Sequence, residues 1–150
     1  MKKIISILIA LVTIAGVADA QITVRKSEAE VPQKLTTLSM YWSWIYSQND
    51  SYYLVMNSTN EFDNNFWLKI GSNKEECLES LSSLLELFDT MEETDRFDIG
   101  NGEGESFSVT MGRELGIEKL IFHGEGYAGT GFLYASNISK AEKWIEKNMK

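Results

Sequence analysis

The chain has 150 residues, of which 43% are hydrophobic and 24% charged, a composition typical of one globular domain. Its single cysteine excludes an internal disulfide, and one cysteine with one histidine excludes the Cys/His zinc sites. The net charge of −8 argues against nucleic acid and anionic membrane surfaces as partners, because both are bound by clustered Lys and Arg side chains.

The first twenty residues have the pattern of a secretory signal peptide. Residues 1–3 give a basic start, residues 4–18 form a largely apolar run, and residues 18–20 read Ala-Asp-Ala, a small-residue ending of the kind that signal peptidase cleaves. A membrane anchor is the alternative, but the apolar run spans about 22 Å as a helix, short of a hydrocarbon core of about 30 Å. We therefore expect cleavage and a bacterial protein in the periplasm or outside the cell, free of the membrane. Export also separates the chain from cellular nucleotides, so no cofactor is expected.

The body of the chain begins with a polar arm at residues 21–34, and the single predicted domain spans residues 35–150. Strict alternation over residues 38–47 predicts one half-buried strand. The expected core side of this strand carries Leu38, Met40, Trp42, Trp44 and Tyr46. Turn residues at 48–50 and a renewed alternation over 52–56 predict a β-hairpin.

A strand and a long helix follow the hairpin. Phe66, Leu68 and Ile70 alternate as in a third strand, and Ser72 with Glu75 matches the capping box that opens a helix. The helix is predicted from apolar residues that recur at steps of four and three, namely Cys77, Leu81, Leu84, Phe88 and Met91. It is about five turns long and ends in an acidic stretch.

The second half of the chain repeats this order. Strands are predicted at residues 96–99, 106–111, 117–123 and 132–135, and a closing helix at 136–150. Runs of strands separated by two helices predict the α+β class, as a two-layer arrangement with two helices packed on one face of an antiparallel sheet.

Two strand-to-helix junctions share the same residues where the strand ends and the helix begins. Residues 68–73 and 132–137 share the Ser-Asn ending and lie 64 residues apart, which a βββα duplication would explain. The alternative is that two unrelated junctions use the same capping residues because both favour helix starts.

Nine of the 11 glycines lie between Gly100 and Gly131, and seven of these nine fall in two segments, residues 100–105 and 124–131, that are predicted to be loops at one sheet edge. The second loop carries the G-x-G-x-x-G spacing at residues 124–129 and offers Gly126 and Tyr127 as binding candidates. Nucleotide binding is not expected there, because a strand follows the glycines where a dinucleotide site needs a helix.

The first of these loops, residues 100–105, is acidic and, together with Asp98 just before it, is a weak candidate for a cation site. Its oxygen ligands for Ca²⁺ would come from Asp98, Glu103 and Glu105, but the spacing does not match an EF-hand. A solvated acidic turn is the favoured interpretation, and no metal is expected.

Catalytic residues are few. A hydrolase centred on His123, with Glu125 and Asp98 as helpers, is the enzymatic hypothesis, although no nucleophile motif supports it. Cys77 falls on the apolar side of the first helix and is expected to be a buried hydrophobic residue.

Aromatic residues give the stronger functional hypothesis. Alternation puts Tyr41, Tyr53 and Trp67 on the sheet face opposite the core, where rings stack on sugars or anchor a protein. The alternative is cross-strand pairing that only stabilises the sheet. We expect an exported, non-enzymatic binding module for a protein or glycan. A domain that self-associates through the same face is a further alternative.

Overall fold

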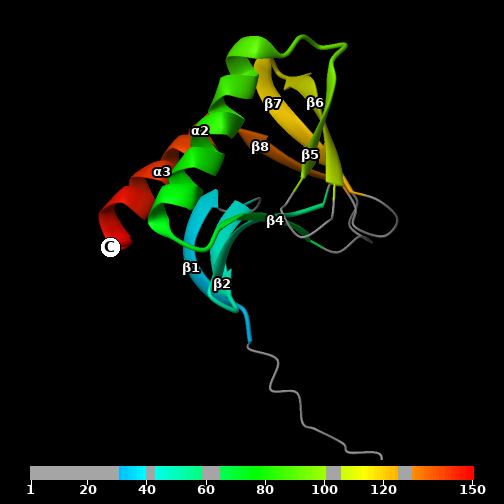
Figure 1. The fold of residues 1–150 in the computed structure, drawn as a ribbon. Coiled ribbons are helices and arrows are strands. Elements are labelled where there is room, and N and C mark those ends of the chain that lie inside the picture. Colours follow the sequence, from blue (N-terminus) through cyan, green and yellow to red (C-terminus); the bar gives the residue numbers. More distant parts are fainter. Residues whose placement is uncertain (1–30, 40–42, 59–64, 101–105, 125–129) are drawn as a thin grey trace, which may run out of the picture.

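The computed structural model describes residues 31–39, 43–58, 65–100, 106–124 and 130–150. Its elements, in chain order, are β1 (Gln33–Ser39), β2 (Ser43–Gln48), β3 (Ser51–Met56), β4 (Phe66–Gly71), α2 (Lys74–Thr90), β5 (Arg96–Gly100), β6 (Ser106–Glu114), β7 (Ile117–His123), β8 (Thr130–Tyr134) and α3 (Ala135–Asn148). The predicted signal at residues 1–20 lies outside the described residues. Figure 1 shows this arrangement.

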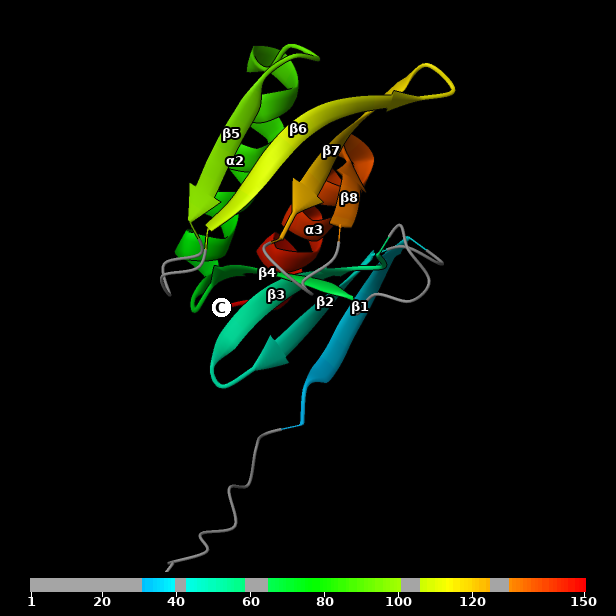
Figure 2. The same ribbon diagram turned by 90° about the vertical axis from the view of Figure 1, so that its right-hand side faces the viewer.

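The strands form two four-stranded antiparallel sheets, with orders β1-β2-β3-β4 and β5-β6-β7-β8. The predicted α+β class with antiparallel pairing is therefore confirmed, but two sheets take the place of the expected one. The helices α2 and α3 lie side by side, and both contact both sheets (Figure 1, Figure 2). Four strands and one helix follow each other twice, and the proposed duplication of the halves stays a prediction.

The first predicted strand is wrong in its extent and phase. Residues 33–39 and 43–48 form two paired strands, β1 and β2, instead of one strand over 38–47. The alternation slips between them, so that Ser43 and Ile45 are buried while Trp44 is only half-buried. A continuous pattern of ten residues concealed this break, because Leu38 and Ile45 belong to the same face but fall on opposite sides of a period-two count.

Two hairpins have tight two-residue turns. Asn49 and Asp50 join β2 to β3 with φ of 49° and 54°, the positive values that a type I′ turn requires and that Asn and Asp tolerate. This confirms the predicted hairpin. Leu115 and Gly116 join β6 to β7 with φ of 52° and 82°, which puts a leucine where short polar residues or glycine are usual.

The start of α2 differs from the predicted capping box by one residue. Asn73 is the N-cap, and its Oδ1 accepts from the Glu76 backbone N–H at 2.9 Å. Glu76 Oε2 in turn accepts from the Ser72 backbone N–H at 2.8 Å. In α3 the matching residue Asn137 lies within the first turn and accepts from the Tyr134 backbone N–H at 3.1 Å. The two junctions therefore use their shared asparagines at different positions.

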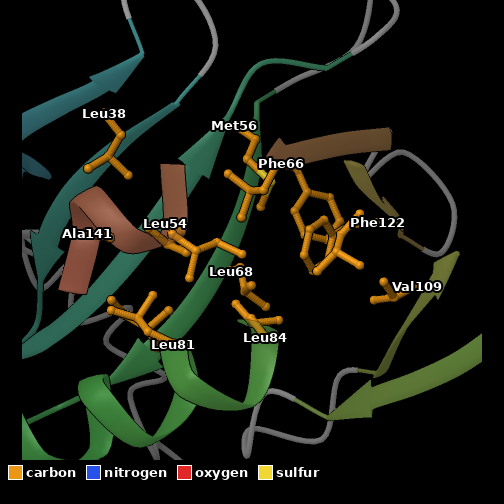
Figure 3. Packing of buried hydrophobic residues seen from close by; sticks show 14 of the residues in the cluster. Leu38, Leu54, Met56, Phe66, Leu68, Leu81, Leu84, Val109, Phe122 and Ala141 are labelled. Atoms are coloured by element: carbon orange, nitrogen blue, oxygen red, sulfur yellow. The ribbon is translucent and has the colours of Figure 1, made fainter. Parts of the chain in front are cut away.

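The core lies between the helices and the inner faces of both sheets (Figure 3). Alternate residues of β4 and β6 fill it. They are Phe66, Leu68 and Ile70, whose alternation predicted the strand, and Phe107, Val109 and Met111. The helices contribute Cys77, Leu81, Leu84, Ile138, Ala141 and Ile145.

Phe66 joins the two sheets. Its ring meets Phe107 edge-on with centroids 4.8 Å apart, and it lies 5.9 Å from the ring of Phe122. Gly131 of β8 lies against β3 and β4 here, since an added Cβ would approach the Phe66 Cβ to 2.9 Å and the Met56 Cβ to 3.1 Å. The two halves thus share one packed interior.

Candidate functional site

Four aromatic side chains share the outer face of the β1–β4 sheet. Because β2, β3 and β4 pair in register, Trp44 lies across from Val55, which lies across from Trp67, and Tyr46 lies across from Tyr53. Paired residues point to the same side of a sheet. Leu54 and Leu68, which alternate with them, point toward the helices (Figure 3), and Ile45 belongs to the same buried cluster. We call Trp44, Tyr46, Tyr53 and Trp67 the outer aromatic face.

Ring contacts hold this face together. The Trp67 ring lies 5.2 Å from Tyr46 and 5.8 Å from Tyr53, at interplanar angles of 60° and 69°. Val55 is only 1% exposed although it points away from the helices. Large flanking side chains such as Trp44 and Trp67 account for burial at such a position. All four aromatic residues are themselves half-buried, so part of each ring remains open to solvent.

Lys34 of β1 extends the outer aromatic face toward the edge of the sheet. Its Nζ lies 5.0 Å from the centroid of a Trp44 ring, within the range of a cation–π contact. Lys34 is exposed and pairs across the strands with Tyr46. A cation therefore stands beside the rings.

The structure brings together two of the three aromatic residues predicted from the sequence. Tyr53 and Trp67 are in contact on the face opposite the core, and Tyr41 lies outside the described residues. Sequence reasoning missed Trp44 and Tyr46 and assigned them to the core, because the strand break was not recognised. The available signal was the pair of apolar residues Leu38 and Ile45, seven positions apart, which cannot both face inward on an unbroken strand.

The enzymatic hypothesis centres on three residues in one cross-strand row. Asp98 pairs with Ser108, and Ser108 pairs with His123, so all three point to the outer face of the β5–β8 sheet. However, a triad needs the imidazole between the hydroxyl and the carboxylate. Here the serine stands in the middle, and its Oγ accepts from Arg96 Nη2 at 2.7 Å.

His123 is held by a threonine. Its Nε2 lies 2.9 Å from Thr110 Oγ1, and the ring is partly buried. Burial lowers the pKa of His123, and the positive charge of Arg96 lowers it further, so the imidazole is neutral at pH 7. We therefore interpret the contact between His123 and Thr110 as a structural hydrogen bond. Glu125, the other proposed helper, lies outside the described residues, and the hydrolase hypothesis stays a prediction without a matching geometry.

Asp98, one of the three weak metal candidates, lies on β5. Glu103 and Glu105 lie outside the described residues, as do Gly126 and Tyr127. Within the described ranges, no three His, Cys, Asp or Glu side chains gather where they would hold a metal ion. A strand, β8, begins at Thr130 after the glycines, as predicted.

Cys77 is a buried thiol. Burial raises its pKa to about 12, and the neighbouring Glu76 adds to this effect. The thiol stays protonated at neutral pH, which removes the nucleophilic form.

A cleft of about 460 Å³ lies between α2 and the edge strands β4 and β5. Its apolar lining comes from Leu68, Ile70, Leu84, Leu87, Phe97 and Ile99. Phe97 is 43% exposed although it points to the inner side of its sheet, because β5 is an edge strand. Charged groups at the cleft include Lys69, Glu79 and Asp98.

Comparisons with known protein families, with curated proteins and with solved structures find no match for this chain. Among the helices in the described part of the chain, none has the length and apolar character needed to cross a membrane.

Proposed function

We propose that the protein is an exported, non-enzymatic binding module that holds a glycan on its outer aromatic face. The single observation that supports this is the gathering of Trp44, Tyr46, Tyr53 and Trp67 on a sheet face that the helices leave open. Sugar rings have apolar C–H faces, and part-exposed aromatic rings on a flat sheet complement them. Burial of apolar surface contributes about 25 cal/mol per Å², so covering about 60 Å² of one ring is worth about 1.5 kcal/mol.

A glycan fits this face better than a protein partner does. Protein hot spots are anchors that fill deep, fully desolvated pockets, whereas these rings lie across a sheet and pack against each other. The lysine beside Trp44 supplies a hydrogen-bond donor of the kind that sugar oxygens accept.

The test is substitution of the rings one at a time. Trp44→Ala and Trp67→Ala should each weaken retention on a binding polysaccharide about tenfold in affinity electrophoresis, because each removes one stacking surface. Tyr134→Phe, on the other sheet, is the matched control and should bind like the wild type. Circular dichroism and thermal unfolding verify that each variant folds. Unchanged retention by both folded tryptophan variants would reject the proposed face.

Export is part of the same proposal and has its own measurement. Mass spectrometry of the natural protein should find a chain that begins at Gln21 in the periplasm or the medium. A soluble intracellular chain that still starts with Met1 would contradict it.

A further inference from the structure

Charge is distributed unevenly between the two sheets. The chain has 22 Asp and Glu residues, yet β1, β2, β3 and β4 contain none of them and carry Lys34 and Lys69. The strands of the other sheet contain both signs, and four of these charges pair: Arg113 with Glu118 at 2.7 Å and Lys119 with Glu114 at 2.6 Å. The only charged residues within the strands β1, β2, β3 and β4 are therefore these two lysines.

From this distribution we infer that the ligand of the outer aromatic face is an anionic polysaccharide that carries carboxylates along its chain. This inference rests on the proposed function and names the class of glycan. A stacked sugar ring directs its substituents outward, toward the margins of the aromatic surface. A carboxylate on the sugar ring would then lie close to the charged side chains at the edges of the aromatic surface.

The lysines stand at those margins. Lys34 lies on β1 and Lys69 on β4, the two edge strands of the sheet, with the aromatic rings on the strands between and beside them. Lys69 pairs across the strands with Tyr53 and so faces the same side as the rings. Three strand spacings separate the edges, about 14 Å. That span exceeds one sugar ring, so the arrangement suits a polymer with repeated charges.

Lys34 is the better placed of the two for a carboxylate. Its ammonium contacts the Trp44 ring, and within the described residues it has no ion pair with an acidic side chain. Lys119 on the other sheet also lies over an aromatic ring, that of Phe132, but its charge is already met by Glu114. The negative net charge of the whole chain does not prevent local attraction, because surface charges are screened beyond about 10 Å at 0.1 M salt.

The experiment compares each polymer with a derivative whose carboxylates have lost their charge. Polygalacturonate, alginate and hyaluronate are each offered to the full mature chain beside the same polymer after methyl esterification of its carboxylates. Binding is followed by tryptophan fluorescence at low and high salt. We expect at least one untreated polymer to bind about three- to fivefold more tightly than its ester, with the difference lost at high salt.

Matched lysine variants locate the charge. Lys34→Gln should remove most of the preference for the anionic polymer over its ester, because glutamine keeps a hydrogen-bond donor but carries no charge. Lys143→Gln on α3 should keep the wild-type preference. Equal affinity for acid and ester, or a preference that survives Lys34→Gln, would overturn this inference and leave the proposed function standing. If none of the six polymers binds, the anionic class is rejected, and neutral glycans with the tryptophan variants then decide the proposed function separately.

Discussion

Leu115 occupies a backbone conformation that suits another residue. At the tip of the β6–β7 hairpin its φ is 52°, and its side chain is 98% exposed. The left-handed region costs an ordinary residue about 1–2 kcal/mol, because Cβ crowds the following carbonyl oxygen. Because the side chain is exposed, burial of apolar surface does not offset this strain within the described fold.

Leu115→Asn should therefore raise the free energy of unfolding by about 0.5–1 kcal/mol, as measured by urea denaturation. Leu115→Ala is the matched control, since it removes the same apolar surface and keeps the strain, and it should leave stability nearly unchanged. A loss of stability in Leu115→Asn would mean that the leucine makes a contact that matters to the fold.

At the scale of elements, the sequence predicts most helices and strands correctly because their periodicities are undisturbed. The first helix follows from Cys77, Leu81 and Leu84, all buried, and the strands of the second half follow from their alternation. The β1–β2 boundary escapes prediction because β2 carries large apolar side chains on both faces, which makes either phase of the alternation plausible. Trp44 and Ile45 are both large and apolar, and only the packing of the sheet decides which one faces inward.

The candidate site shows the same limit. The outward position of Tyr53 and Trp67 is predicted correctly, because the alternation in β3 and β4 is assigned with the right phase. The positions of Trp44 and Tyr46 are predicted wrongly, because the alternation in β2 is assigned with the wrong phase. The contact of Trp67 with Tyr46 joins residues of two strands that are not neighbours in the sheet. Such a contact depends on the ring reaching across an intervening strand, which no pattern along a single strand encodes.

The cap of α2 gives a prediction at this scale. Asn73→Ala should lower the free energy of unfolding by about 1 kcal/mol, because it leaves the Glu76 backbone N–H without its acceptor. Ser72→Ala, at the position that the sequence pattern favours, keeps the backbone N–H that Glu76 accepts and should change stability by less than about 0.5 kcal/mol. Chemical denaturation of both variants distinguishes them, and the reverse order would restore Ser72 as the cap.

At the scale of the whole molecule, the contact between the sheets makes the halves interdependent. Gly131→Ala should lower the free energy of unfolding by about 1–3 kcal/mol, because the new Cβ would meet Phe66 and Met56 at 2.9 Å and 3.1 Å and overpack the junction. We expect circular dichroism and tryptophan fluorescence to report one shared transition at the lowered midpoint.

Gly100→Ala is the control for this substitution. Nothing lies within 4 Å of a Cβ added at Gly100, so its effect should stay within about 0.5 kcal/mol. Equal losses in both alanine variants would show that the junction is not tightly packed.

The order of the strands has a consequence for how the chain acquires its shape. Every strand pairs only with a neighbour along the chain, so each sheet closes short loops and needs no distant partner. Folding rates rise as contacts become more local. The first sheet, with its aromatic surface, is complete in sequence by Gly71, and later steps add the helix pair and the Phe66 junction. A chain that emerges from its N-terminal end can therefore assemble its strands in the order in which they appear.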